Sequence, residues 1–428
     1  MLDVRGKAME KRVLSLFSGC GGMDLGFEGG FWVPKAMVSP LRRDWIDDER
    51  EMNLNQVFLK KNNFRIIFAN DINVNARNAW VNYFGKRGTE PKIFQLESIV
   101  DLVNKHERGE FSFPKDIDVV IGGFPCQDFS IAGKRQGFKS GKNHLGVLTE
   151  EQGEAKRGEL YRWMKRVIEI TNPKVIVAEN VKGLASLGSC REQIENDFCN
   201  MGRKGYVVFT KVLYAPHYGI PQRRERLFFI GLNCEYIRPD VRDLLRGSNL
   251  RGDPLGLFPP RTHDVGDKEQ GLLWDEGYVP CPPLKSILED LPEPEDSLED
   301  LAQRRYSQVS YCGRGVQGQT EVNLSGLAPT IRAEHHGHIE YRRLSKEHGG
   351  KYADEFERGY RERRLTVREC ARIQTFPDDY GFIYPKGCAY PLEASASYRL
   401  IGNAVPPLLA YHVARNIDKK WAILIANN

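Results

Sequence analysis

The stretch Ile121-Gly-Gly-Phe-Pro-Cys-Gln-Asp-Phe-Ser130 decides how the rest of the chain is interpreted. The run Asp116-Ile-Asp-Val-Val-Ile121 leads into it and predicts a short buried strand, because its apolar residues are mostly β-branched. Two glycines and Pro125 follow, so the strand must end there. We therefore expect Cys126 just beyond the carboxyl end of a strand, where open α/β sheets hold their ligands.

Cys126 allows two interpretations. A cysteine in a loop on a rigid base is well placed to act as a nucleophile, and Gly122 and Gly123 let another molecule approach closely. A lone cysteine can equally pack as a small buried hydrophobe, which is the more common state. Residues elsewhere in the chain have to decide between the two.

Length and composition describe an ordinary globular protein. The 428 residues, 41% hydrophobic and 28% charged, are enough for one large and one smaller domain. We find no apolar run of membrane-spanning length and no signal peptide, so we expect a cytoplasmic protein without membrane contact. The nine cysteines show no CxxC spacing, which argues against a zinc ribbon or a disulfide framework. The net charge of +5 is compatible with a polyanionic partner.

A glycine-rich turn follows the first expected strand, residues 13–17. Ser18-Gly-Cys-Gly-Gly-Met-Asp-Leu-Gly26 leads from that strand into a helix. Such turns present backbone amides to nucleotide-like ligands, although a tight turn without a ligand would look the same. Residues 65–69 predict the second strand, which ends at Asp71. That carboxylate is placed to accept hydrogen bonds from ribose hydroxyls, to cap the next helix, or both.

Strands and helices continue to alternate. Residues 93–99, 116–121 and 173–178 predict further strands, residues 160–171 predict a helix, and residues 206–214 and 226–231 predict a hairpin-like pair. The segment 32–64 is longer than a usual crossover, and its mixed-charge run 42–51 predicts a solvated helix. The polar segment 132–158 predicts a mobile loop, which either closes over a substrate or has no role.

Two charged motifs fall at the same expected sheet edge as Cys126. The strand 173–178 ends in Glu179-Asn180-Val181, and a partly desolvated glutamate there can hold and donate a proton near neutral pH. Tyr218-Gly-Ile-Pro-Gln-Arg-Arg-Glu-Arg226 places three arginines within four positions. They suit a phosphate or a base edge, or else a surface ion-pair cluster with Glu225.

The character of the sequence changes between residues 233 and 362. Prolines, glycines and charges become frequent there, which predicts a second, smaller and irregular domain. Residues 1–232 and 363–428 would then form one discontinuous larger domain. The run Ala333-Glu-His-His-Gly-His338 has no cysteine or carboxylate at ligand spacing, so we expect no metal there. Polar contacts to a phosphate or a base edge suit it better.

The last part of the chain predicts two features. Arg364-Leu-Thr-Val-Arg-Glu begins a helix in which Thr366 is the N-cap and Glu369 completes a capping box. Ser397-Tyr-Arg-Leu-Ile-Gly-Asn-Ala-Val-Pro-Pro407 precedes a helix that we expect to reach residue 417. Gly402-Asn403, before that helix, offers an amide-rich ligand contact.

Six of these motifs, in this order, resemble those of the C5-cytosine-specific DNA methyltransferase family of bacterial restriction-modification systems. They are Phe17-Ser-Gly-Cys-Gly-Gly, Gly123-Phe-Pro-Cys-Gln, Glu179-Asn-Val, Gln222-Arg-Arg-Glu-Arg, Arg364-Leu-Thr-x-Arg-Glu and Gly402-Asn-Ala-Val-Pro-Pro. Pro329-Thr-Ile331 also looks like the threonine-aliphatic pair of the family's recognition domains. The resemblance covers nearly the whole chain except about 233–328 and the early insertion.

The resemblance implies an α/β, Rossmann-like domain that binds S-adenosyl-L-methionine, with a target recognition domain at 233–362. It implies that Cys126 adds to a cytosine flipped out of double-stranded DNA, while Glu179 contacts ring N3, Asn180 orients the loop and Arg226 binds O2. The implied catalytic residues are Cys126, Glu179, Asn180, Arg224 and Arg226. The implied cofactor-binding residues are Phe17, Ser18, Gly19, Cys20, Gly21, Gly22, Asp71, Ile72, Ser98, Ile99, Gly123, Pro125, Leu160, Asn403, Ala404 and Val405. The implied DNA contacts are Gln127, Ser130, Arg224, Thr330 and Arg332.

The chain departs from the family pattern in three places. Ile72 stands where the family often has a bulky aromatic against adenine. Glu97-Ser-Ile99 replaces the usual Gly-Asp-Ile, so contact with the adenine amino group falls to Ser98 or to Glu97. The long loop after Cys126 is expected to affect closure.

The resemblance also implies a partner enzyme, and three alternative functions have to be weighed against it. We expect a monomer whose counterpart is a restriction endonuclease acting on the same DNA site. An RNA (tRNA) cytosine-5 methyltransferase of the same family shares the catalytic motifs, but a long variable domain favours an enzyme that reads a DNA groove. A non-catalytic DNA-binding regulator would be expected to lack Cys126 or Glu179, and both are present. The glycine pattern does not fit a Rossmann-type oxidoreductase.

Overall fold

The structure, a computed structural model, describes residues 10–50, 55–125, 160–186, 188–247, 252–265, 278–333 and 336–426. Cys126, Gln127, Ser130 and the expected loop 132–158 lie outside these ranges.

Within the described ranges, a sheet of seven strands has the order β5-β4-β1-β6-β7-β9-β8. The strands are β1 (Lys11–Leu16), β4 (Phe64–Asp71), β5 (Phe94–Leu96), β6 (Val119–Gly122), β7 (Val175–Val181), β8 (Tyr206–Tyr214) and β9 (Glu225–Asn233). From β5 to β7 all neighbours pair in parallel, whereas β9 runs antiparallel to both β7 and β8. The expected α/β fold and the hairpin-like last pair are confirmed.

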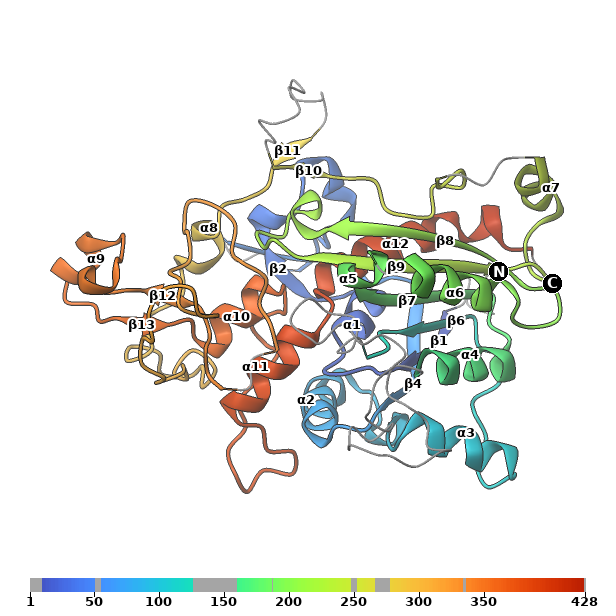
Figure 1. Ribbon diagram of the computed structural model, residues 1–428, viewed down its shortest axis with the longest axis horizontal. Coiled ribbons are helices and arrows are strands. Elements are labelled where there is room, and N and C mark those ends of the chain that lie inside the picture. The colour runs from blue at the N-terminus through green and yellow to red at the C-terminus, as the bar shows by residue number, and fades with distance from the viewer. Residues whose placement is uncertain are drawn as a thin grey trace.

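Helices cover both faces of the sheet, which explains why its central strands are continuous apolar runs. Val13, Ile121 and Val177 belong to the core on one face, which includes α1 (Gly22–Glu28), α2 (Val74–Phe84) and α12 (Pro407–Leu424). Leu14 and Val120 belong to the core on the other face, which includes α3 (Ile99–Glu107), α4 (Leu160–Thr171) and α6 (Gly188–Cys199). Figure 1 shows the central sheet with these layers around it.

Helices α1 and α12, from opposite ends of the chain, pack directly on each other. A Cβ built on Gly26 would lie 2.4 Å from Ala410 Cβ and 2.5 Å from Pro407 O, so the contact requires glycine. Helix α12 also runs past its expected end at residue 417, to Leu424. Leu424 and Ile425 are buried, and Ile425 forms a bridge with Ile237.

The early insertion differs from the expected solvated helix. Strands β2 (Trp32–Pro34) and β3 (Gln56–Phe58) pair antiparallel, and the 3₁₀ helix η2 (Pro40–Trp45) lies between them. Trp45 is 8% exposed because its ring packs edge-on against Tyr411 and His412 of α12. The charged residues of the run 42–51 suggested full exposure to solvent, whereas Trp45 within it packs against α12. Other short 3₁₀ helices are η1 (Lys35–Met37), η3 (Gly85–Arg87), η4 (Pro91–Ile93), η7 (Ala215–Tyr218) and η8 (Lys346–His348).

The segment after β9 has short, irregular elements, as expected. They are α7 (Pro239–Gly247), β10 (His263–Asp264), β11 (Val279–Pro280), α8 (Lys285–Leu288), β12 (Tyr341–Arg343), α9 (Ala353–Glu357) and β13 (Arg363–Arg364). Figure 1 shows α8, α9, β12 and β13 gathered at one end of the molecule and α7 near the other. We call the described part of 278–362 the recognition lobe, after the role that the family resemblance implies for it. Asn416 of α12 donates to the carbonyls of Gly256 and Leu257, so this earlier part packs on the sheet domain. The boundary at residue 233 stays a prediction.

Buried ion pairs join the recognition lobe to the returning chain. Arg343 binds Glu293 at 2.9 Å, and Arg363 binds both Glu293 at 2.8 Å and Glu369 at 2.9 Å. Glu369 lies in α10 (Val367–Ile373), where it completes the predicted capping box with Thr366. The lobe is therefore fastened to the helix through which the chain re-enters the sheet domain.

Candidate active site

The ends of four parallel strands meet at one edge of the sheet. At this edge a turn follows Leu16 at the end of β1, and Asp71 is the last residue of β4. Gly123 follows β6, and Glu179 lies near the end of β7. Parallel strands end on the same side, so topology brings these residues together. Strand β9 runs in the opposite direction and begins there, with Arg226 in register with Val181.

Glu179 and Arg226 form a nearly buried ion pair at this edge. Arg226 Nε lies 2.9 Å from Glu179 Oε1, and the side chains are 12% and 9% exposed, respectively. Burial raises the pKa of Glu179, while the positive charges of Arg226 and Arg224 oppose the rise. The carboxyl group therefore keeps a proton closer to neutral pH than a free glutamate does.

The segment that leads to Cys126 lies against this pair. A Cβ built on Gly123 would be 3.1 Å from Glu179 Oε2, so the backbone passes beside the carboxylate. Asn180 Nδ2 donates to Phe124 O at 3.2 Å, and Asn180 Oδ1 accepts from Val181 N at 2.9 Å. Asn180 thus holds the backbone just before Pro125. Leu160, which opens α4, is buried.

The arginines of the 222–226 motif lie in different surroundings. Arg223 is exposed, whereas Arg224 is fully buried. Arg224 donates to the carbonyls of Ile331 at 2.9 Å, Gly402 at 2.9 Å and Ala404 at 2.6 Å. Its guanidinium therefore joins two separate backbone segments, around residue 331 and at 402–404.

Gln222 and Gln374 extend that junction. The sequence analysis quoted Gln222 only as part of the 222–226 motif and assigned neither residue a role. Gln222 Nε2 donates to Gln374 Oε1 at 2.7 Å, and Gln222 Oε1 accepts from Ile331 N at 3.0 Å. Gln374 Nε2 donates to the carbonyls of Ile401 and Ala404. These contacts link residues far apart in sequence, so no local pattern reveals them.

The predicted DNA contacts that the structure describes lie beside this junction. Thr330 donates its hydroxyl hydrogen to the carbonyl of Arg223, and Arg332 is exposed. A Cβ built on Gly402 would lie 2.2 Å from Arg332 O. The 330–332 stretch therefore runs beside residues 222–224, just before β9, and its Arg332 side chain is open to solvent.

We call Phe17–Gly22 the cofactor turn. Phe17, Gly19 and Gly21 have positive φ angles of 53°, 54° and 79°. A Cβ built on Gly21 would lie 2.7 Å from Trp80 Cδ1, whereas one built on Gly19 would meet nothing within 4 Å. The turn is packed tightly on its inner side and leaves open space beside Gly19.

Three further members of the predicted cofactor set face the protein. Ser18 Oγ accepts from Asn70 N at 3.1 Å. Cys20 is buried, and burial raises the pKa of its thiol. A Cβ built on Gly22 would lie 2.3 Å from Val405 O, so the 403–405 segment supports the turn. Residues 402–403 also end α11 (Ala394–Asn403), and the Ala404 amide donates to Leu400 O within the helix end.

Asp71 lies across from the turn. Its Oδ2 accepts from Gly19 N at 3.0 Å and its Oδ1 from Asn73 N at 2.9 Å. Ile72 is 48% exposed beside it, and Val74 and Leu96 are 51% and 40% exposed. Leu96 pairs in register with Asp71, so an apolar patch flanks the carboxylate. The sequence analysis did not include Val74 and Leu96 among the cofactor-binding residues. The position of Leu96 at the end of an expected strand was the only sequence feature that indicated its place in this patch.

The two candidates for the adenine amino group already have partners. Ser98 caps α3, accepting from Val100 N at 3.2 Å, and it is 4% exposed. Glu97 forms an ion pair with Lys105 at 2.5 Å. Ile99 is buried. The side chain of Glu97 remains 31% exposed, so it is the more accessible of the two.

The sequence profile of C-5 cytosine-specific DNA methylases matches residues 53–419. The chain belongs to that family. The type II methyltransferase M.BsuRI of Bacillus subtilis is 30% identical over 418 residues, which cover 96% of this chain and 80% of that protein. The type II methyltransferase M.NgoPII of Neisseria gonorrhoeae is 27% identical over 420 residues, covering 95% of each. The family resemblance expected from the motifs is confirmed.

Solved structures of methyltransferases share the fold of this methylase. Dnmt2 of S. pombe superposes with a TM-score of 0.54 at 17% identity, covering 96% of this chain and 99% of that one. The Entamoeba histolytica methyltransferase EhMeth superposes with a TM-score of 0.54 at 13% identity, covering 97% and 99%. These similarities confirm the Rossmann-like architecture.

The sheet edge of the methylase fits an adenosyl cofactor. Asp71 offers carboxylate oxygens at the end of β4. Ile72, Val74 and Leu96 offer exposed apolar surface beside it. Open space lies beside Gly19, and a Cβ at that position would fill part of it. This donor set matches a nucleoside with a ribose and a flat base.

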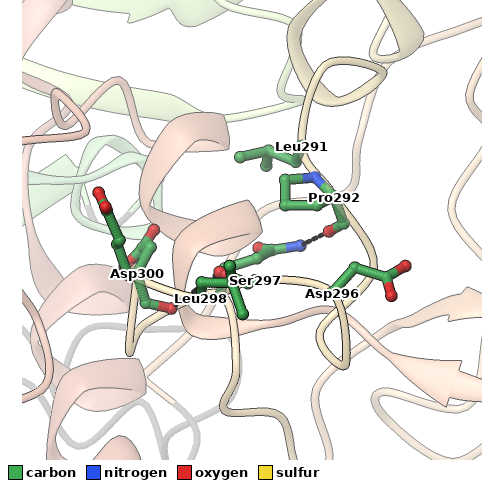
Figure 2. Close-up of a pocket in the computed structure, with 8 residues that line it drawn as sticks. Leu291, Pro292, Asp296, Ser297, Leu298 and Asp300 are labelled. Carbon is green, nitrogen blue, oxygen red and sulfur yellow. Dashed lines mark hydrogen bonds between the residues drawn. The ribbon is translucent and has the colours of Figure 1, made fainter.

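Other features of the methylase lie away from this edge. Figure 2 shows a pocket on the recognition lobe lined by Leu291, Pro292, Ser297 and the carboxylates of Asp296 and Asp300. Asp300 is paired with Arg368 at 2.6 Å, so Asp296 and Glu299 supply the negative charge, which disfavours a phosphate backbone there. In the part of the chain that the structure describes, no three His, Cys, Asp or Glu residues gather in a way that could hold a metal ion. No helix there is long and apolar enough to cross a bilayer.

Proposed function

We propose that this methylase transfers a methyl group from S-adenosyl-L-methionine to carbon 5 of a flipped cytosine in a short, specific site of duplex DNA. The observation that carries the proposal is the Glu179–Arg226 pair, which lies beside Gly123, three residues before Cys126. A proton donor, a cation and a nucleophile would then share one sheet edge with the open side of the cofactor turn.

The cytosine ring needs activation, because carbon 5 is a poor nucleophile. In our proposal the Cys126 thiolate adds to carbon 6, forming a C–S bond and placing the electron pair of the ring double bond at carbon 5. Glu179 stabilises the charge that this addition sends to N3, by donating a proton or a hydrogen bond. Arg226, oriented by Glu179, binds O2.

The bound cofactor supplies an electrophilic methyl group on a sulfonium. Carbon 5 would take that methyl group as S-adenosyl-L-homocysteine leaves. A base or water would then remove the proton from carbon 5, and the freed electron pair would expel the Cys126 thiolate from carbon 6 and restore the ring double bond. Within a duplex, carbons 5 and 6 are stacked between base pairs, so the base has to leave the helix first. Asn180 positions the Phe124–Pro125 backbone from which Cys126 continues.

The remaining residues have supporting roles in this proposal. Arg224 acts as a positioning residue, since its described hydrogen bonds go to backbone carbonyls. Thr330 and the exposed Arg332 follow the edge on which the duplex would lie. The recognition lobe reads the DNA sequence, and the relatives named as type II methyltransferases support a modification role with a cognate restriction endonuclease.

A duplex with 5-fluorocytosine at the target tests the covalent step. Fluorine cannot leave carbon 5 as a proton, so after methyl transfer the protein should stay attached to the DNA and survive denaturing electrophoresis. The target is first located by bisulfite sequencing of DNA from expressing cells. An adduct in the Cys126→Ser variant, or none with the wild type on a duplex that it methylates without fluorine, would contradict the mechanism. Methylation of tRNA instead of duplex DNA would contradict the substrate.

A further inference from the structure

Asp24 is a fully buried acid that the proposed chemistry does not use. It lies in the first turn of α1, directly after the cofactor turn, and its side chain is 0% exposed. A buried carboxylate is strongly destabilising unless its oxygens are hydrogen-bonded. The hydrogen-bond donors to the Asp24 carboxylate therefore indicate its structural role.

Both oxygens of Asp24 have a donor. Ser15 Oγ donates to Oδ1 at 2.6 Å, and Trp80 Nε1 donates to Oδ2 at 2.7 Å. The Trp80 ring is stacked on Phe84 with centroids 4.4 Å apart, which fixes the direction of its N–H group. The indole can only donate, so the carboxylate accepts from both sides.

Ser15 extends these contacts to the cofactor turn. Ser18 Oγ donates to Ser15 Oγ at 2.9 Å and accepts from Asn70 N at 3.1 Å. Asn70 immediately precedes Asp71, whose carboxylate accepts from Gly19 of the turn. A directed chain of hydrogen bonds thus runs from the end of β4 through Ser18 and Ser15 to Asp24.

We infer that Asp24 is a positioning residue for the cofactor: its carboxylate is the acceptor-only end of this chain and holds the cofactor turn against Asp71. The inference rests on the proposed function, because the ligand is S-adenosylmethionine. Asp24 itself touches neither the cofactor nor the base. It acts by fixing which way the hydroxyl groups of Ser15 and Ser18 point.

The surroundings of Asp24 make this device sensitive to pH. Burial raises the pKa of Asp24 to about 7, the bonds from Ser15 and Trp80 oppose the rise, and Glu28 adds to it. Cys20 and Tyr380 are the other titratable groups that interact with it, and burial raises both their pKa values, so they stay neutral. Below about pH 7 the carboxyl group gains a proton and is no longer acceptor-only. The chain then loses its fixed direction, and cofactor affinity should fall.

Calorimetric titration of the full-length protein with S-adenosylhomocysteine, without DNA, tests the inference. At pH 8 the Asp24→Asn variant should bind ~10-fold more weakly than the wild type, the loss expected for one hydrogen bond to a charged group. The ratio of the wild-type affinity to the variant affinity should fall towards one as the pH falls to about 5.5. Burial also raises the pKa of Asp71, but that group is common to both proteins and its effect cancels in the ratio. Ser15→Ala, which interrupts the chain and keeps the carboxylate, should also weaken binding.

Asn233→Ala is the matched control. Asn233 is equally buried and donates to Asn172, Pro173 and Tyr206 at the far end of the sheet. This variant should lower the melting temperature and leave the affinity unchanged. Unchanged affinity in both Asp24→Asn and Ser15→Ala would overturn the inference, and Ser15→Ala decides alone if Asp24→Asn does not fold. A wild type that neither binds S-adenosylhomocysteine nor methylates DNA would contradict the proposed function instead.

Discussion

Glu179 Oε1 and Arg226 Nε lie 2.9 Å apart, across the first contact between the parallel part of the sheet and its antiparallel end. Val181 of β7 is in register with Arg226 of β9, so the side chains of Glu179 and Arg226 meet because β9 runs antiparallel to its neighbours. An all-parallel sheet would place the start of β9 at the opposite edge. The reversal therefore supplies the cation that orients the glutamate.

Replacing Glu179 by Gln should slow methyl transfer at least ~10²-fold, the usual contribution of a general acid. The amide cannot supply the proton, while its size preserves packing beside Gly123. Glu225→Gln is the matched control, because Glu225 pairs with the more exposed Lys182 and faces away from this contact. Single-turnover rates with saturating DNA measure the effect. Equal rates for Glu179→Gln and Glu225→Gln would remove Glu179 from the chemistry.

Cys126→Ser should abolish methylation while S-adenosylhomocysteine binding persists. A serine hydroxyl stays protonated at neutral pH and is a far weaker nucleophile than a thiolate. Cys312→Ser is the control, because Cys312 is an exposed thiol on the recognition lobe. Tritium transfer from the labelled cofactor to duplex DNA distinguishes the two variants. Substantial turnover in Cys126→Ser would mean that another residue attacks carbon 6.

Arg224→Ala and Arg223→Ala should separate positioning from DNA contact. Loss of the Arg224 guanidinium leaves the carbonyls of Ile331, Gly402 and Ala404 without this donor and should lower the free energy of unfolding by ~3 kcal/mol. Arg223 is exposed, so its removal should leave stability unchanged and reduce the salt dependence of DNA binding by about one unit of slope. Urea unfolding and binding isotherms at several salt concentrations measure both. A stable Arg224→Ala protein would show that the junction does not depend on this side chain.

Stability should fall as the pH drops from 6.5 towards 4. Burial lowers the pKa of His263 from 6.5 to about 4, so between these values the unfolded chain binds a proton that the folded protein does not. Linkage then favours unfolding by at most ~1.4 kcal/mol per pH unit from this one group. Urea unfolding of the wild type and of His263→Asn at several pH values isolates the effect, because other titrating groups are common to both. The variant should lose less stability on acidification, and parallel losses would contradict the prediction.

Exchanging residues 278–362 for those of a relative with another specificity should change the DNA sequence that is methylated. Starting the exchange at 278 keeps the contacts of Ile237, Gly256 and Leu257 with the end of the chain. The donor segment must keep the counterparts of Glu293, which joins the lobe to Arg363, and of Arg343, which binds Glu293. Bisulfite sequencing gives the new site. A chimera that is active on the original site would place recognition elsewhere.

The sequence predicted those elements whose causes are local. Residues 119–121 and 175–178 are apolar throughout because helices cover both faces of their strands, and Thr366 and Glu369 form their capping box within one helical turn. Strand ends were therefore predictable, and with them the gathering of Asp71, Gly123 and Glu179.

The features that the sequence did not reveal depend on distant partners. Trp45 is buried because α12 offers Tyr411 and His412, which no pattern near residue 45 indicates. The sequence motif predicts that Arg224 binds a phosphate or a base. Its described hydrogen bonds instead go to backbone carbonyls more than a hundred residues away in the sequence. Side-chain bonds to a remote backbone leave no periodicity in the sequence.

The contact between Gly26 and Ala410 means that α1 can pack in its final position only after α12 has been synthesised. Helix α1 directly follows the cofactor turn, but its packing surface on α12 is synthesised only after all the other helices and strands described above. Closing a contact over such a separation is slow and requires the intervening chain. A nascent chain therefore cannot support the cofactor turn through the α1–α12 contact until α12 has been made. Removing α12 from a mature molecule would withdraw the same support.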